Sequence, residues 1–368
     1  MSKAAELAKW GEVSTNGQVS GRRNIVINGA MNVAQRSASV TGIGAAAGYF
    51  TVDRWKVSPS GTAGRLTMTQ TADGPTGFAN CLKLDCTTAD ASIAAGEYMI
   101  ISQRFEGQDL QSIGKGVAGA KEITVSFYVK ANAAFTFGVE LEDLDNGRQI
   151  TKLFNTTTGW VRHEFVIPAD VDDGSSPFGD DNASSLSIQF WLHAGATFAG
   201  GTLNTTAWAN ITNANRAAGI DSFFSSTDNN FFITGIQLEV GSVATPFEHR
   251  SYGEELALCQ RYFQVYGGTA YATIASGMQP NNTNAKFHLS YMQEIRTAPS
   301  IAVSDVTELI VTDRTGFDTV LSGLSGNVAG KTSAYMSAQF GESGAGGRGI
   351  LLAVKNGTTT TLSLDSEF

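Results

Sequence analysis

The sequence predicts an all-β protein: a jelly-roll β-sandwich followed by a second, smaller β-sandwich or meander domain, with a short helix at the N-terminus. Apolar and polar residues alternate in many short runs, which is the two-residue period of a half-buried strand. The 368 residues include 41 glycines and many Ser, Thr and Asn clusters, which suit the turns between strands. A chain of this length is longer than one hydrophobic core usually accommodates, so two β domains are expected.

The first segment, residues 1–22, is expected to be an anchor made of a helix and a tether. Apolar residues fall on one face of its first ten residues, and Gly11 is placed to end the helix. A helix this short is not stable alone, so it must dock on something. We predict that Leu7 and Trp10 dock on another copy or another protein, and that residues 14–21 are a flexible tether. The alternative is a frayed terminus.

Residues 23–250 are expected to form the sandwich. Apolar residues alternate with polar ones over 123–129 and again over 135–141, and the two runs are separated by only five residues. This spacing predicts a hairpin with one shared apolar face. Further strands and long polar loops complete the domain: strands at 186–192 and 236–240, loops at 170–185 and 200–230.

A short linking helix is predicted at residues 251–264. Ser251 and Glu254 have the S-x-x-E spacing in which the serine caps a helix and the glutamate bonds back to the capping residue. Beyond this helix, residues 265–368 contain short apolar runs between turns, which predict the second β domain.

Composition argues against several classes of function. The formal net charge is −9, so a phosphate backbone would be repelled and nucleic acid is not expected as a partner. The first residues lack the apolar region of a secretory signal, and no stretch approaches the roughly 20 apolar residues of a membrane span. Cys81, Cys86 and Cys259 show no zinc-binding spacing and cannot all pair. No cofactor, structural metal or membrane insertion is expected.

The sequence also lacks a catalytic signature, so no enzyme is expected and neither catalytic nor metal-binding residues are assigned. Its four histidines, among them His163 and His193, are too dispersed to give a local metal site or triad. Glu140, Glu142 and Asp143 form an acidic run that ends in the turn dipeptide Asn146-Gly147. Acidic residues at an exposed strand end are common, so we expect them to be solvated rather than catalytic.

Two stretches of the chain resemble bacteriophage proteins. Residues 22–36 read RRNIVINGAMNVAQR and are followed by VDRW at 52–55. Residues 236–250 read IQLEVGSVATPFEHR and are followed by YGEELALCQRY at 252–262. These opening and closing motifs resemble those that frame the jelly-roll domain of phage tail-fibre and receptor-binding proteins. Their residues look structural. The two segments are expected to pair as neighbouring strands, with Asn28 and Gly29 in a turn or bulge of the opening strand and Trp55 in the core. Pro246 and Phe247 are expected to end the closing strand, because proline cannot donate to a strand ladder.

The resemblance implies a carbohydrate-binding-module-like jelly roll that assembles as a homotrimer in a virion appendage. It implies attachment to another tail or virion protein through the N-terminus, synthesis in the host cytoplasm, and binding to a host-surface glycan without covalent chemistry. The chain has no heptads, collagen-like repeat or β-helical shaft, which favours a short fibre. The alternatives are a head-decoration, collar or baseplate protein that binds no receptor, and a glycan-degrading tailspike enzyme.

Glycan binding would use aromatic rings that stack on sugar faces. Trp208, Phe223 and Phe224 are the candidate contacts, because they lie in or near the long polar loop 200–230. The alternative is that these rings fill the sandwich core or a trimer interface, since large aromatic residues are usually buried.

Overall fold

The computed structural model describes residue 3 and residues 22–171, 176–315, 318–341 and 346–368. The chain divides into two compact units, Met1–Glu255 and Leu256–Phe368. The predicted N-terminal helix and its anchor residues Leu7 and Trp10 lie outside the described residues. Among the described residues, no helix is long and apolar enough to cross a membrane.

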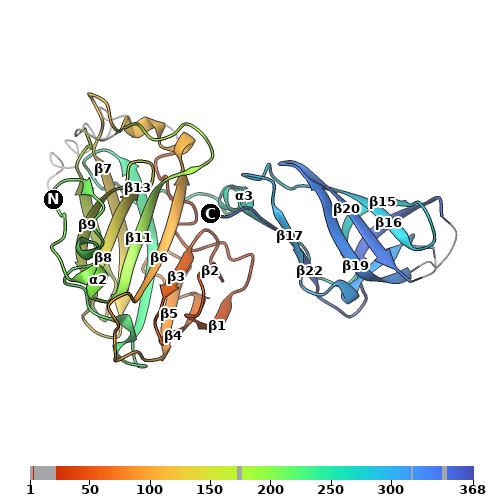
Figure 1. Cartoon of the computed structure of the whole chain (residues 1–368), viewed down its shortest axis with the longest axis horizontal. Helices are drawn as coiled ribbons and strands as arrows, with labels where there is room; N and C mark the ends of the chain where they lie inside the picture. Colours follow the sequence, from red (N-terminus) through yellow and green to blue (C-terminus); the bar gives the residue numbers. More distant parts are fainter. Residues whose placement is uncertain (1–2, 4–21, 172–175, 316–317, 342–345) are drawn as a thin grey trace. The chain divides into compact units, whose positions relative to one another are not determined.

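The first unit is a β-sandwich of two antiparallel sheets (Figure 1). The six-stranded sheet has, in spatial order, β1 (Ser39–Ile43), β4 (Arg65–Thr71), β5 (Cys81–Thr88), β13 (Asn230–Val240), β7 (Ile123–Ala131) and β10 (Val161–Ile167). The seven-stranded sheet has β12 (Ala209–Asn210), β9 (Arg148–Asn155), β8 (Thr136–Asp143), β11 (Ser184–Ala194), β6 (Tyr98–Glu106), β3 (Lys56–Ser60) and β2 (Gly48–Tyr49).

Short helical segments lie in the connections of this unit. They are α2 (Ala196–Ala199) and the 3₁₀ helices η1 (Gly107–Asp109), η2 (Gln111–Ile113), η3 (Asn213–Asn215) and η4 (Phe223–Ser225). Of these, α2, η3 and η4 belong to the connection between β11 and β13, most of which the sequence predicts as a long loop.

The hairpin predicted from the runs 123–129 and 135–141 is wrong, although both strands exist. Strand β7 pairs with β13 and β10 in one sheet, whereas β8 pairs with β9 and β11 in the other. The short connection therefore crosses between the sheets, as several connections in this unit do, in the manner of a jelly roll. Alternation shows that both strands have an apolar face, but it does not distinguish pairing within a sheet from packing across the core.

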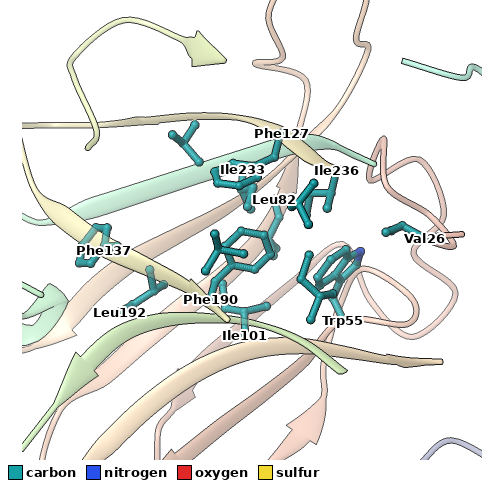
Figure 2. Packing of buried hydrophobic residues seen from close by; sticks show 14 of the residues in the cluster. Val26, Trp55, Leu82, Ile101, Phe127, Phe137, Phe190, Leu192, Ile233 and Ile236 are labelled. Carbon is teal, nitrogen blue, oxygen red and sulfur yellow. The ribbon is translucent and has the colours of Figure 1, made fainter. Parts of the chain in front are cut away.

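The two sheets meet in one aromatic-rich core (Figure 2). Phe127 from the six-stranded sheet packs edge-on against Phe190 of β11, with ring centroids 5.1 Å apart. Phe137 of β8 meets Phe231 of β13 in the same way at 5.6 Å. Edge-to-face contacts of this kind add to the apolar area that the rings bury. The alternating apolar faces predicted from the sequence thus supply both sides of the core.

The opening and closing motifs are neighbours, as the sequence predicts, but they do not pair as two regular strands. The Ile25 amide donates to the Leu238 carbonyl at 2.8 Å, and the Asn24 side chain bonds the backbone of both Ile236 and Leu238. Glu248 accepts hydrogen bonds from the amides of Arg23 and Asn24. However, the opening segment forms bends and turns instead of a regular strand, and β13 already ends at Val240, before Pro246 and Phe247.

Asn28 is the centre of the opening motif. Its backbone has a φ of +58°, a left-handed conformation that asparagine tolerates better than most residues. Its side chain donates to the carbonyls of Val33 and Asp53 and accepts from the Val33 amide at 3.0 Å. Its own carbonyl accepts from the indole of Trp55, which is fully buried in the core. The motif residues thus hold one another, which is a structural role.

The second unit contains a closed barrel and a small sheet (Figure 1). The barrel runs through β15 (Thr273–Gln279), β16 (Asn284–Ser290), β20 (Ser333–Phe340), β19 (Asp318–Ala329), β18 (Leu309–Thr312) and β21 (Arg348–Val354). The sheet consists of β14 (Phe263–Gly267), β22 (Thr361–Asp365) and β17 (Ser300–Val303), and the 3₁₀ helix η5 (Val306–Glu308) precedes β18. The predicted sandwich or meander is corrected here, because β15 pairs with β21 as well as β16 and closes the ring.

The helix predicted after residue 250 is α3 (Tyr252–Gln260). Its N-terminus has the expected reciprocal cap: the Glu254 amide donates to the Ser251 hydroxyl, and the Ser251 amide donates to the Glu254 carboxylate at 2.9 Å. Two exposed backbone donors are satisfied in this way. The helix ends before residue 264, because Phe263 already begins β14.

Candidate functional site

The outer face of the seven-stranded sheet is hollowed into a groove of about 290 Å³. Strands β3, β6, β8 and β11 form its floor, and the connection between β11 and β13 adds two side chains from one side. The lining residues are Lys56, Ser58, Tyr98, Ile100, Ser102, Arg104, Glu142, Ser187, Gln189, Trp191, Phe198 and Arg216.

Strand alternation explains why these side chains face outward. In β11 the residues Ile188, Phe190 and Leu192 enter the core, so the residues between them point to the opposite face. In β6, Met99 and Ile101 likewise enter the core. Each strand therefore supplies the sandwich with one face and the groove with the other.

Three aromatic rings form one end of the groove. Tyr98 and Trp191 lie with ring centroids 5.8 Å apart, and Phe198 of α2 packs against both, at 5.0 Å from Tyr98 and 5.5 Å from Trp191. Trp191 is only 2% exposed, whereas Tyr98 and Phe198 are half-buried. The cluster thus presents partly open ring surface that is held in place by its neighbours.

Arg216 fixes the polar side of the groove. Its guanidinium lies 2.8 Å from carboxylate oxygens of both Glu140 and Glu142, and it sits over the Trp191 ring at 5.1 Å from the centroid. The Trp191 indole donates to Glu140 at 2.8 Å, and Gln189 donates to Glu142. One network therefore joins β8, β11 and the long loop, and it holds the aromatic cluster rigidly.

Glu140 is fully buried beneath this network. Burial raises the pKa of its carboxyl group from 4.5 to about 7, although Arg216 and the Trp191 indole favour the charged form and lower the pKa. The same carboxylates raise the pKa of Arg216, which burial alone would lower. Glu142, the carboxylate that lines the groove, is held by Arg216 and Gln189. Both carboxylates thus act as partners of a guanidinium in this structure.

The arrangement suits the binding of a polar ligand that has apolar faces. The half-buried rings of Tyr98 and Phe198 offer stacking surface, while Ser58, Arg104 and Gln189 add hydroxyl, guanidinium and amide groups. Binding sites of this kind combine aromatic walls with a few convergent polar groups.

The three aromatic residues predicted as glycan contacts are corrected by the structure. Phe223 and Phe224 are 0% exposed and belong to the sandwich core, where their ring centroids lie 5.3 Å apart. Trp208 is 7% exposed and donates its indole N–H to the Pro168 carbonyl at 2.9 Å. All three rings fill the core, because the loop that carries them folds its apolar residues inward, so none offers an open face to a sugar.

The acidic run around Asp143 is structural and is not solvated as predicted, because Glu140 and Asp143 are both 0% exposed. Asp143 lies 2.6 Å from the buried ammonium of Lys115, and it accepts the backbone amides of Asp145 and Asn146. Gly147 has a φ of +62°, and β8 pairs with β9 on either side of this turn, as the Asn-Gly dipeptide predicts. The carboxylate is thus occupied with an ion pair and with turn formation.

The groove residues were missed in the sequence, although one signal was present. Trp191 alternates with Ser187 and Gln189 on the polar face of its strand, where a large aromatic ring is unexpected. Phe198 and Arg216 come from the intervening loop, and their approach to this face depends on the folded course of that loop.

Comparison of the sequence with family models and with curated proteins gives no match. Solved structures similar to the chain are carbohydrate-binding modules. TmCBM61 in complex with β-1,4-galactotriose has 12% identity and a TM-score of 0.30, covering 60% of this chain and 99% of that chain. A CBM4 structure has 12% identity and a TM-score of 0.29, with 58% and 97% coverage.

A family 11 module from Clostridium thermocellum, solved in complex with a β-1,3-1,4-mixed-linked tetrasaccharide, has 12% identity and a TM-score of 0.27. The aligned region covers 52% of this chain and 91% of the family 11 module.

Proposed function

We propose that this protein binds a glycan, without covalent chemistry, in the groove on the outer face of the seven-stranded sheet. The observation that carries the proposal is the aromatic cluster of Tyr98, Trp191 and Phe198 beside the polar groups of the same groove. A pyranose has an apolar face that stacks on aromatic rings and hydroxyl groups that need donors and acceptors, and the groove supplies both.

The state of the carboxylates supports binding in preference to hydrolysis. Glycoside hydrolysis uses a carboxylate that attacks or activates water and a carboxylic acid that donates a proton. Here Glu140 and Glu142 share the guanidinium of Arg216, and Glu140 is buried under the Trp191 indole. A carboxylate engaged in this way is a poor nucleophile, so the network supports a role in holding the groove.

We further propose that the protein is a short homotrimeric phage tail fibre whose groove binds a host-surface glycan. The support comes from the resemblance of the opening and closing motifs to those of phage tail fibres, and in this structure the two motifs contact each other through Asn24. In this proposal the N-terminal segment attaches the trimer to another tail protein in the virion.

Binding of purified full-length protein to an array of bacterial surface glycans tests the first proposal. We expect binding to a defined set of glycans. We expect Tyr98→Ala and Phe198→Ala to weaken it about 5- to 150-fold, if a sugar stacked on one ring loses about the 1–3 kcal/mol that a nucleic-acid base loses. Tyr335→Ala is the matched control, because Tyr335 is an exposed tyrosine of the barrel and should not affect binding. Unchanged affinity in both groove variants would refute the groove as the site.

Competition tests the second proposal. Excess purified protein is expected to block adsorption of the phage that encodes it, and Tyr98→Ala protein is expected to block less at the same concentration. A head-decoration, collar or baseplate protein without receptor binding would leave adsorption unchanged. Release of new reducing ends from a bound glycan would instead support the tailspike alternative and contradict binding without chemistry.

A further inference from the structure

A buried cluster at one end of the sandwich brings together Asp90, Glu97 and His193. Asp90 lies in the connection that follows β5, Glu97 immediately precedes β6, and His193 is near the end of β11. One ligand atom of each residue lies within 4.8 Å of those of the other two. All three residues are less than a tenth exposed, and His193 is 0% exposed. The dispersed histidines of the sequence give no hint of this grouping.

A β-bulge explains how His193 reaches the interior. Trp191 pairs with Ile100, and both belong to the groove face, but the register shifts between Trp191 and His193. His193 therefore pairs with Met99, a core residue, and its ring packs edge-on against Phe224 at 5.4 Å. In a regular strand, residues two apart point to the same face, so without the bulge His193 would face outward with Trp191.

The cluster leaves two buried polar atoms without hydrogen bonds. Within the part of the chain that the structure describes, neither His193 Nε2 nor Glu97 Oε2 has a hydrogen-bond partner, and the two atoms lie 3.7 Å apart. Asp90 Oδ2 accepts from Thr62 and Ala63, whereas Oδ1 accepts only the Ser92 amide at 3.3 Å and retains a lone pair. A buried polar atom without a hydrogen bond lowers the stability of the fold. Two such atoms that face each other therefore indicate a ligand that both of them bind.

The electrostatics of the cluster call for a cation. Among the described residues, no lysine or arginine forms an ion pair with Asp90. The one ion-pair partner of Glu97 there is His193. Hydrogen bonds from Thr62, Ala63 and Ser92 offset the charge of Asp90, whereas Glu97 Oε2 faces the His193 ring with no cation from the described part of the chain beside it.

From these contacts we infer that Asp90, Glu97 and His193 bind one divalent transition-metal ion, with zinc the best fit. Zinc accepts imidazole nitrogen and carboxylate oxygen at about 2.0–2.2 Å, so two of its ligand atoms lie about 3.4 Å apart, close to the 3.7 Å between Nε2 and Oε2. Calcium and magnesium prefer oxygen ligands, so the imidazole disfavours them. His193 Nδ1 is hydrogen-bonded to the Ser222 hydroxyl at 2.8 Å. A histidine that binds a metal through one ring nitrogen usually makes such a hydrogen bond with the other.

The ion would link the connection that carries Asp90 and Glu97 to the end of β11. Because Tyr98 directly follows Glu97 and Trp191 is two residues before His193, it would also hold the strand ends that carry the aromatic cluster of the groove. The inference does not rest on glycan binding, since its ligands line the core side of these strands. Zinc binding and glycan binding can therefore fail independently.

Metal analysis of the full chain tests the inference. Protein stripped with a chelator, dialysed against zinc chloride and freed of excess metal is expected to retain one zinc ion per chain and to show a higher Tm than the stripped protein. Calcium chloride is expected to do neither. The inference would be overturned if the wild-type protein retained no stoichiometric zinc, which is the result expected when only a water molecule bridges the cluster. Retention of calcium in place of zinc would also overturn it.

Variants locate the site. Glu97→Gln keeps the shape of the side chain but removes the carboxylate, and is expected to weaken zinc binding at least about 100-fold, while Ser222→Ala, which loosens the ring of His193, should weaken it about 10–100-fold. His163→Gln and Glu164→Gln are matched controls on β10, in the other sheet, and should bind zinc as wild type does. Zinc affinity unchanged in folded Glu97→Gln protein would overturn the assignment.

Discussion

At the scale of single residues, Asn28 is the clearest example of a side chain that holds the fold together. It combines a left-handed backbone with three side-chain hydrogen bonds to buried backbone groups. Asn28→Gly keeps the backbone freedom but loses the three bonds, and is expected to lower the free energy of unfolding by about 3 kcal/mol. Asn28→Ala should cost about 1–2 kcal/mol more, because alanine is strained at this φ. Urea unfolding measures the stability of both variants. Equal stability of the two would contradict the expected backbone strain of alanine at residue 28.

Glu140 predicts a pH dependence of stability. Burial raises its pKa to about 7 in the folded protein, whereas the unfolded carboxyl titrates near 4.5. Between these values the folded state retains a proton that the unfolded state releases, so this contribution to stability is full below pH 4.5 and is lost as the pH rises through 7. Glu140→Gln lacks the titration, so the stability of wild type relative to this variant should fall from pH 5 to 8.

Unfolding curves at several pH values measure this difference. The exposed Glu164→Gln is the control and is expected to keep the wild-type slope, because Glu164 lies at the surface and pairs there with Arg162. A constant stability difference between wild type and Glu140→Gln across this pH range would contradict the raised pKa.

At the scale of elements, the bulge in β13 depends on a glycine. Gly235 has a φ of +63°, and a Cβ placed there would lie 2.7 Å from a ring atom of Phe78 and 2.8 Å from one of Tyr128. Gly235→Ala is therefore expected to destabilise the sandwich by about 2 kcal/mol or more, through strain and through displacement of the rings. Gly253→Ala, on the exposed face of α3 with nothing within 4 Å, should instead be neutral or stabilise by up to about 1 kcal/mol. Thermal unfolding of the two variants compares them.

The sequence predicts strands better than it predicts their partners. Alternation locates β7, β8 and β11, and the Ser251–Glu254 spacing locates the start of α3, because these signals are local. Whether β7 and β8 pair or face each other depends on the course of a short connection. Closure of the barrel in the second unit likewise depends on β15 meeting β21, which is far along the chain.

The candidate site was harder to predict than the fold. Trp191 stands out on a polar strand face, but its partners Phe198 and Arg216 come from a loop whose path is set by tertiary contacts. The loop residues with the most prominent rings, Phe223 and Phe224, enter the core instead. The cluster of His193 with Asp90 and Glu97 depends on a one-residue bulge that alternation does not reveal.

At the scale of the whole molecule, the proposed fibre predicts a homotrimer. Light scattering coupled to size-exclusion chromatography should give three times the mass of one chain at micromolar concentration. Removal of residues 1–21 should leave the assembly trimeric, at three times the mass of the shortened chain, because the sandwich is proposed to trimerise. The same deletion should abolish attachment to the partner tail protein. A monomer under these conditions would contradict the trimeric fibre, but it would leave glycan binding by a single groove possible.

The central claim is that a glycan binds in the groove of the seven-stranded sheet. The most direct measurement is a crystal structure of the protein with an oligosaccharide that it binds on the array. A sugar ring stacked on Tyr98 or Phe198, with its hydroxyl groups bonded to groove side chains such as Arg104 or Gln189, is the predicted result. An oligosaccharide bound elsewhere, with the groove occupied only by solvent, would contradict the claim.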